Sequence, residues 1–153
     1  MDHSRFESIL GDHTESIQID YDPTVISYEK LLDVVSTNET YFFRDISPFE
    51  LLQHKIIPDL IDKRNAESQG KQPVQIRIWS AASSTGQEIY SIAIVLKELY
   101  LEPPQYDIKL LGTDISNEAI AKASYGRYNK FEMARGLTPS RLGKYLLIPH
   151  ISN

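Results

Sequence analysis

The order of three segments in the middle of the chain limits the folds that it can adopt. Residues 74–82 alternate apolar and polar side chains and then turn to small ones, as in a strand that runs into a tight loop. Residues 86–100 repeat apolar side chains at helical spacing, and residues 106–115 form a second strand-like run that contains Asp114. This succession predicts the opening of a doubly wound α/β fold.

Helical segments are predicted on both sides of this pattern. A capping serine predicts a helix over residues 27–35, whereas residues 1–24 show no sustained period and are expected to be poorly ordered or loosely docked. The Ser47-Pro48 pair predicts the start of a longer helix with a kink at Pro58. Short helices after the second strand are predicted over residues 117–124 and 139–145.

These segments divide the chain, whose 153 residues are enough for a packed core, into three regions. Residues 1–64 form an N-terminal helical region, in which the last helix ends near Arg64. Residues 65–73 form a polar linker, and residues 74–153 form an α/β domain.

Composition argues against several classes of protein. The net charge of −5 argues against nucleic acid as a partner, and no apolar run approaches the roughly 20 residues of a membrane span. The chain has no cysteine, and its four histidines lack metal-ligand spacing, so no metal is predicted. Because the N-terminus is unlike a signal peptide, a cytoplasmic location is expected. The basic stretch at residues 120–145 fits a solvated helical face better than a binding patch.

The loop between the first strand and its helix is suited to a ligand. Ala81, Ala82 and Ser83 are small enough for a ligand to lie against the backbone. The helix beyond Gly86 offers free N–H groups and a partial positive charge, although a loop with one glycine is a weak match to dinucleotide sites. Glu88, in the first turn, either favours the helix dipole or meets a positively charged amino group of a ligand.

Two further residues have both a structural and a functional interpretation. Asp114, at the end of the second strand, can accept hydrogen bonds from both hydroxyls of a ribose, or it can cap the next helix. Arg44 can clamp a carboxylate with two hydrogen bonds, or it can form a structural salt bridge. It follows Phe42 and Phe43, which fit core anchors.

Taken together, these segments resemble the CheR family of chemotaxis-receptor methyltransferases. The resemblance rests on residues 37–45 (Thr-Asn-Glu-Thr-Tyr-Phe-Phe-Arg-Asp), 79–93 (Trp-Ser-Ala-Ala-Ser-Ser-Thr-Gly-Gln-Glu-Ile-Tyr-Ser-Ile-Ala) and 112–116 (Gly-Thr-Asp-Ile-Ser), in matching order and spacing. Residues 123–128 and 135–145 are similar to the helix-and-linker region of the family.

The resemblance implies a fold, an activity and a cofactor. The fold would be an N-terminal helical region followed by the first half of a Rossmann-like class I methyltransferase sheet. The activity would be transfer of a methyl group from S-adenosylmethionine to glutamate side chains on the cytoplasmic helices of chemoreceptors, which leaves S-adenosylhomocysteine. The implied cofactor contacts are Asn38, Thr40, Arg44, Glu88 and Asp114. Of these, Asp114 would hold the ribose, and Arg44, as the catalytic residue, would orient the substrate carboxylate.

The chain also departs from the pattern of the family. In residues 86–91, Gln87 stands in place of an acid and Ile89 in place of proline, whereas Glu88 is kept. Family members continue beyond the point of Asn153 with a cofactor-contacting Asn-Leu and a further strand, which indicates a fragment or a truncated paralogue. The alternative function is therefore a cofactor-binding or regulatory module without catalysis. A third hypothesis is a generic α/β protein that binds NAD or ATP. In a fragment, an open sheet edge would favour a dimer.

Overall fold

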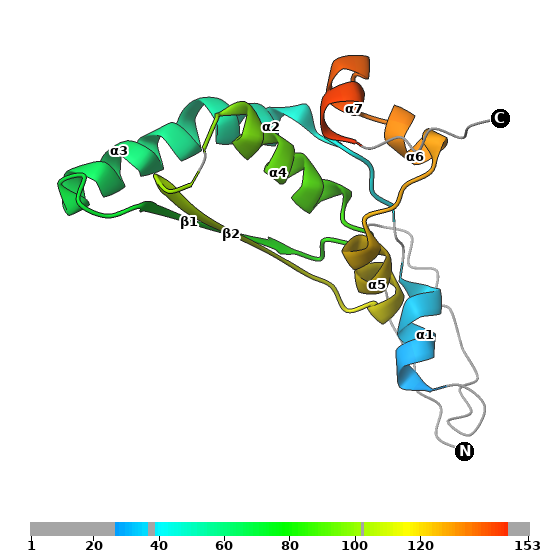
Figure 1. Cartoon of the computed structure of the whole chain (residues 1–153). Helices are drawn as coiled ribbons and strands as arrows, with labels where there is room; N and C mark the ends of the chain where they lie inside the picture. Colours follow the sequence, from blue (N-terminus) through cyan, green and yellow to red (C-terminus); the bar gives the residue numbers. More distant parts are fainter. Residues whose placement is uncertain (1–26, 37–38, 102, 147–153) are drawn as a thin grey trace, which may run out of the picture. The chain divides into compact units, whose positions relative to one another are not determined.

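A computed structural model describes residues 27–36, 39–101 and 103–146 of the chain. The chain divides into two compact units, Met1–Ser36 and Thr37–Asn153. The second unit holds both strands and every described helix except α1 (Figure 1).

Helix α1 spans Tyr28–Val35 in the first unit. The hydroxyl of Ser27 accepts a hydrogen bond from the Lys30 amide at 3.3 Å, so the serine caps the helix as predicted. The prediction for residues 1–24 lies outside the described residues.

The long helical segment of the second unit has three parts. Helix α2 spans Ile46–Leu51, a π-helical stretch η1 spans Leu52–Ile56, and α3 spans Ile57–Ser68. Pro58 has no amide hydrogen to donate to the preceding turn, and that turn takes up π geometry at the place where a kink was predicted.

Both ends of this segment differ from the prediction. The N-cap is Asp45 rather than Ser47, and proline is tolerated at the third position because the first amides of a helix have no partner inside it. Helix α3 passes Arg64 and ends at Ser68, before Gln69 with a left-handed φ of 53°. In the last turn Asn65, Ala66 and Glu67 are exposed and Ser68 is partly buried, so the turn has no apolar period to reveal it in the sequence.

Two parallel strands form the sheet. Strand β1 spans Val74–Ala81 and β2 spans Tyr106–Thr113, and their residues pair in register from one end to the other. The connection between them contains α4, Gln87–Glu98, which contacts β2 (Figure 1). The predicted α/β chain with a strand–helix–strand order is therefore confirmed.

The two faces of the sheet differ in burial. On β1, Val74, Ile76 and Ser80 are buried. On the opposite face, Trp79 exposes 68% of its surface and Leu111, its partner in the register, exposes 58%. Within the described residues one face is therefore packed and the other is open.

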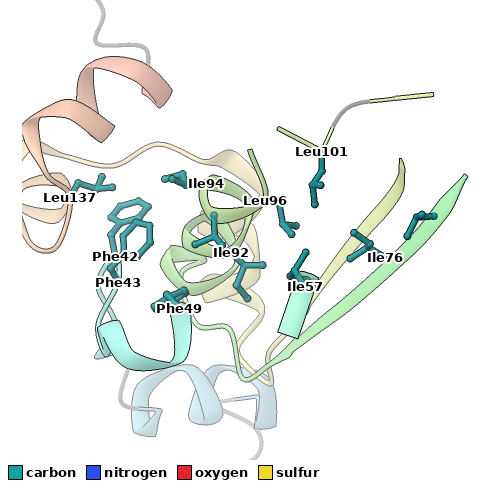
Figure 2. Packing of buried hydrophobic residues seen from close by; sticks show 12 residues of the cluster. Phe42, Phe43, Phe49, Ile57, Ile76, Ile92, Ile94, Leu96, Leu101 and Leu137 are labelled. Atoms are coloured by element: carbon teal, nitrogen blue, oxygen red, sulfur yellow. The ribbon is translucent and has the colours of Figure 1, made fainter. Parts of the chain in front are cut away.

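Helix α4 lies at the centre of the hydrophobic core. Residues of this helix and of the segment before α2 gather in one cluster, which includes Val95. Figure 2 shows Phe42, Phe43, Ile92, Ile94 and Leu96 of this cluster. Ile92 and Leu96, four residues apart, are buried on one side of the helix, and Ile94 and Val95 are buried as well. The helix is therefore covered on more than its sheet-facing side, and the interpretation of both phenylalanines as core anchors is confirmed.

Among the described residues, three short helices follow β2. They are α5, Asn117–Tyr125, α6, Lys130–Ala134, and α7, Pro139–Tyr145. The starts of α5 and α7 are as predicted, whereas α6 was missed because five residues carry little more than one turn of periodicity. A capping box marks its start, since the amides of Asn129 and Glu132 each donate to the side chain of the other. No helix among those described has the length and apolar surface to cross a membrane.

Candidate cofactor-binding site

The carboxyl ends of β1 and β2 lie side by side and bring Asp114 next to the loop that follows β1. Ser80 pairs with Gly112 and Ala81 pairs with Thr113, so both strands end at the same level. In open α/β folds, ligands bind at this edge of a parallel sheet.

The loop of residues 82–86 is strained and tied to β2. Ala82 and Ser84 have φ values of 55° and 49°, in the left-handed region, which costs a residue with a side chain about 1–3 kcal/mol. The Ser83 amide donates to the Thr113 carbonyl at 2.9 Å and fixes the loop on the neighbouring strand. Strain of this kind persists only where the surroundings hold it, and it is typical of ligand sites.

Two glycines allow the close packing of this loop. A Cβ on Gly112 would lie 2.7 Å from the Ser83 Oγ. A Cβ on Gly86, where φ is 96°, would lie 2.9 Å from both the Ala123 Cβ and the Tyr128 hydroxyl. Gly112 therefore lets the loop approach β2, and Gly86 lets the start of α4 approach α5.

Asp114 uses both carboxylate oxygens within the chain. Its Oδ2 accepts from the Ser84 amide at 2.8 Å, and its Oδ1 accepts from the Ser116 amide at 2.9 Å. The cap of α5 is Ser116, whose hydroxyl accepts from the Ala119 amide at 3.0 Å. Asp114 therefore orients the strained loop, and a partly exposed carboxylate keeps lone pairs for ligand hydroxyls.

Glu88 lies in the first turn of α4, above the end of β1. The hydroxyl of buried Ser80 donates to its Oε1 at 2.8 Å, while the Glu88 side chain remains exposed. The positive end of the helix dipole stabilises a carboxylate at this position. Glu88 and Asp114 thus stand at the same edge of the sheet, one beside each strand end.

The segment of residues 39–45 is fixed to the same helix. Phe43, with a φ of 50°, donates its amide to the Ser91 Oγ at 3.0 Å. This buried hydroxyl in turn donates to the Gln87 carbonyl at 2.7 Å. Ser91 lies about one helical turn beyond Glu88, so the segment is held beside the predicted cofactor residue of α4.

Arg44 is exposed at the end of this segment. Its Nη1 donates to the Glu39 carbonyl at 2.6 Å, which uses one donor of the guanidinium and leaves others for a ligand. Thr40 is partly buried in the same stretch, and Asn38 lies outside the described residues. The hydrogen bonds that the structure describes for Arg44 and for Asp114 involve different partners, and none of them joins the two residues directly.

Two residues of this region have no role in the sequence-based interpretation. The hydroxyl of Tyr128 donates to the Thr85 carbonyl in the loop at 2.7 Å, and its ring packs edge-on against Phe42 at 5.0 Å between centroids. Burial raises the pKa of the Tyr128 phenol above its ordinary value. The other residue is Ser91. It could have been noticed in the sequence as a polar residue on an otherwise apolar helix face. No local pattern indicates the contact of Tyr128.

A separate groove of about 910 Å³ runs along α4 and the end of α7, with Phe42, Tyr90 and Tyr145 in its walls. Neither Glu88 nor Asp114 lines it, so it is distinct from the strand-end site. Among the residues described, no group of three or more His, Cys, Asp or Glu side chains is placed to hold a metal ion.

The residues at this edge of the sheet lie within a region that is similar to known proteins. The family described as CheR methyltransferase, SAM binding domain, matches residues 38–149. Chemotaxis protein methyltransferase 1 of Pseudomonas aeruginosa is 38% identical over 120 residues, which cover 76% of this chain and 41% of that protein. The chemotaxis protein methyltransferase of Borreliella burgdorferi is 40% identical over 126 residues, which cover 80% of this chain and 40% of that protein.

The chain thus spans about two fifths of the length of these curated relatives. The predicted family is confirmed, and its description names S-adenosylmethionine (SAM), the predicted cofactor. The chain belongs to the CheR methyltransferase SAM-binding domain family.

Proposed function

We propose that this chain binds S-adenosylmethionine at the carboxyl ends of β1 and β2, as the cofactor-binding part of a protein-glutamate O-methyltransferase. The observation that carries the proposal is the placement of Glu88 and Asp114 at one edge, beside a strained loop of small residues. A strand-end carboxylate can accept both ribose hydroxyls, and an exposed carboxylate on α4 can meet the amino group of the methionine part. Two carboxylate acceptors suit a nucleoside that presents ribose hydroxyls and a positively charged amino group.

The proposal includes the fold and the domain organisation. Strands β1 and β2 with α4 would be the first half of a Rossmann-like class I methyltransferase sheet in residues 74–153. Residues 1–64 would be the N-terminal helical region, and residues 65–73, of which the first four belong to α3, would connect the two.

Asn38, Thr40 and Arg44 would complete the site from the segment before α2. The hydrogen bond between Phe43 and Ser91 supports this role, because it holds the segment against the helix that bears Glu88. Arg44 would be the catalytic residue: its guanidinium holds one oxygen of the substrate carboxylate and leaves the other free to attack.

The reaction needs alignment more than acid–base chemistry. A glutamate side chain is ionised at neutral pH, so no strong general base is required. The cofactor supplies a methyl group on a positively charged sulfur. When bound, the cofactor would donate this methyl group to a carboxylate oxygen with the sulfur as leaving group, and the products would be a methyl ester and S-adenosylhomocysteine. The residues of this chain would hold the ribose, orient the carboxylate and exclude water.

The protein substrates would be the cytoplasmic helices of chemoreceptors, and the chain would act in the cytoplasm. Support comes from the names of the two relatives described above, which are both chemotaxis protein methyltransferases.

The site is tested by calorimetric titration of the full chain with S-adenosylhomocysteine. We expect binding by the unmodified chain and a loss of about 100-fold in affinity for Asp114→Ala, because charge-assisted hydrogen bonds to the ribose disappear. Asp59→Ala is the matched control, since Asp59 is an exposed carboxylate on α3 that pairs with Lys55 at 3.3 Å. Absence of binding by the unmodified chain, or equal affinity of the Asp114→Ala variant, would contradict the proposal.

A methyl-transfer assay separates the enzyme from a cofactor-binding module without catalysis. The chain is incubated with labelled S-adenosylmethionine and a receptor fragment, and base-labile methyl ester is measured. Transfer supports the enzyme, whereas cofactor binding without transfer favours the module.

A further inference from the structure

Residues 135–141 pack on the backbone of the segment that carries Arg44. At Gly136, with a φ of 101°, an added Cβ would overlap the carbonyl oxygen of Phe42. Leu137 is buried in the same cluster as Phe42 (Figure 2). The residues that lead into α7 therefore directly contact the segment of residues 39–45, which is far from them in the sequence.

Arg141, in the first turn of α7, joins this contact to α4. Its Nε and Nη2 donate to the two carboxylate oxygens of Glu98, each at 2.9 Å. Its guanidinium carbon lies 4.0 Å above the centre of the Phe43 ring. The side chains of Arg141 and Glu98 expose only 20% and 21% of their surface, so the pair is largely shielded from water.

Phe43 is the residue that this arrangement holds. Its backbone is left-handed, and its amide is fixed by Ser91. Its ring also packs against Phe49, with 5.0 Å between centroids. An aromatic residue keeps a left-handed backbone only when its neighbours fix it, and the next residue along the chain is Arg44.

We propose that Arg141 is a positioning residue for residues 39–45. Paired with Glu98 and stacked on Phe43, it holds the left-handed turn in place and thereby fixes where Arg44 lies relative to α4. The effect on cofactor binding rests on the proposed function, whereas the hold on Phe43 does not.

The position requires arginine, because one side chain pairs through two N–H groups and stacks on a ring at the same time. Lysine keeps the charge but loses the flat, double contact. Arg135 contacts the same segment in a more exposed place. It stacks on the Tyr41 ring at 4.2 Å, but its ion pair with Glu39 measures 3.8 Å and 57% of the arginine side chain is exposed, so water screens this pair more than the pair of Arg141.

Amide hydrogen exchange of the full chain, followed by NMR, tests the hold on Phe43. We expect Arg141→Gln to speed exchange at the Phe43 amide by about 10-fold, while exchange at Val95 in the core of α4 changes by less than about threefold. Arg141→Lys should fall between the two. The control is Arg127→Gln, because Arg127 is an exposed arginine that stacks on Tyr125 at 5.1 Å, and it should leave Phe43 unchanged.

Two results would overturn the proposal. One is equal exchange at Phe43 in the unmodified chain and in Arg141→Gln. The other is faster exchange at Phe43 that is matched at Val95, because a parallel change indicates loss of global stability and not release of one turn.

The link to Arg44 is tested by a double-mutant cycle on S-adenosylhomocysteine affinity. If Arg141 acts through the position of Arg44, the double variant Arg44→Ala, Arg141→Gln binds no more weakly than Arg44→Ala alone. Additive losses of affinity in the double variant would show that Arg141 does not act through the position of Arg44. If the unmodified chain does not bind S-adenosylhomocysteine, the proposed function fails, and exchange at Phe43 still decides whether Arg141 holds the turn.

Discussion

Left-handed backbone conformations occur in both of the segments that form the candidate site. Phe43, Ala82 and Ser84 all have positive φ values, and each costs about 1–3 kcal/mol. The hydrogen bonds from Phe43 to Ser91 and from Ser84 to Asp114 help to hold them. A change of Asp114 therefore removes a predicted ligand contact and also releases the loop that shapes the site.

Two glycines give a matched pair of substitutions at the residue scale. Gly136→Ala should lower the free energy of unfolding by about 2–4 kcal/mol, because the new methyl group overlaps the Phe42 carbonyl and φ is positive. Gly143→Ala should leave stability unchanged or raise it by up to about 1 kcal/mol, since Gly143 lies within α7 and an added Cβ meets nothing within 4 Å. Urea unfolding of the two variants checks this, and equal midpoints would argue against the close approach at Gly136.

At the scale of elements, local signals predict β1, β2, α4, α5 and α7, because each combines a clear period with a cap or a turn residue. The π-helical stretch and α6 depend on details too short to form a period. The site divides in the same way. The placement of Asp114 beside the loop that follows β1 is predictable because the ends of neighbouring parallel strands must meet, and Glu88 follows in the first turn of the next helix. The fixing of residues 39–45 to α4 depends on tertiary packing around Ser91, which local patterns do not encode.

Tyr128, in the linker between α5 and α6, is expected to make the folded chain less stable at alkaline pH. Tyr128 donates to the loop carbonyl of Thr85, and burial, followed by the charges of Tyr90 and Glu132, raises its pKa in the folded chain. The unfolded chain therefore releases the phenol proton first, and the contribution of Tyr128 to stability is complete below a pH of about 10 and falls above it.

Urea unfolding between about pH 9 and pH 11 measures this contribution. Tyr128→Phe should lose stability at neutral pH, because the hydrogen bond to Thr85 is gone, and should show a shallower alkaline decline than the unmodified chain. An identical slope in both proteins would mean that other groups cause the decline.

At the scale of the whole second unit, the sheet favours association. Among the described residues, β1 and β2 pair only with each other, and the face with Trp79 and Leu111 is open. Parallel sheets are ordinarily covered on both faces, and unpaired edges are templates for further strands.

We therefore expect a dimer whose population rises with concentration, measured by light scattering. Leu111→Lys separates two modes of contact: loss of the dimer indicates the open face, and its persistence indicates the strand edge. Phe131→Lys is the control, because Phe131 is 89% exposed on α6, away from the sheet. A constant monomer mass at all concentrations would contradict the prediction.

The position of Trp79 has a practical consequence. It is the sole tryptophan of the chain, and its Nε1 donates to the Thr113 Oγ1 at 3.0 Å, one residue before Asp114. We expect a ligand at the strand ends to alter the surroundings of the indole through Thr113, which precedes Asp114. The chain therefore carries an intrinsic fluorophore at the margin of its candidate site, and emission spectra can follow occupancy without any label.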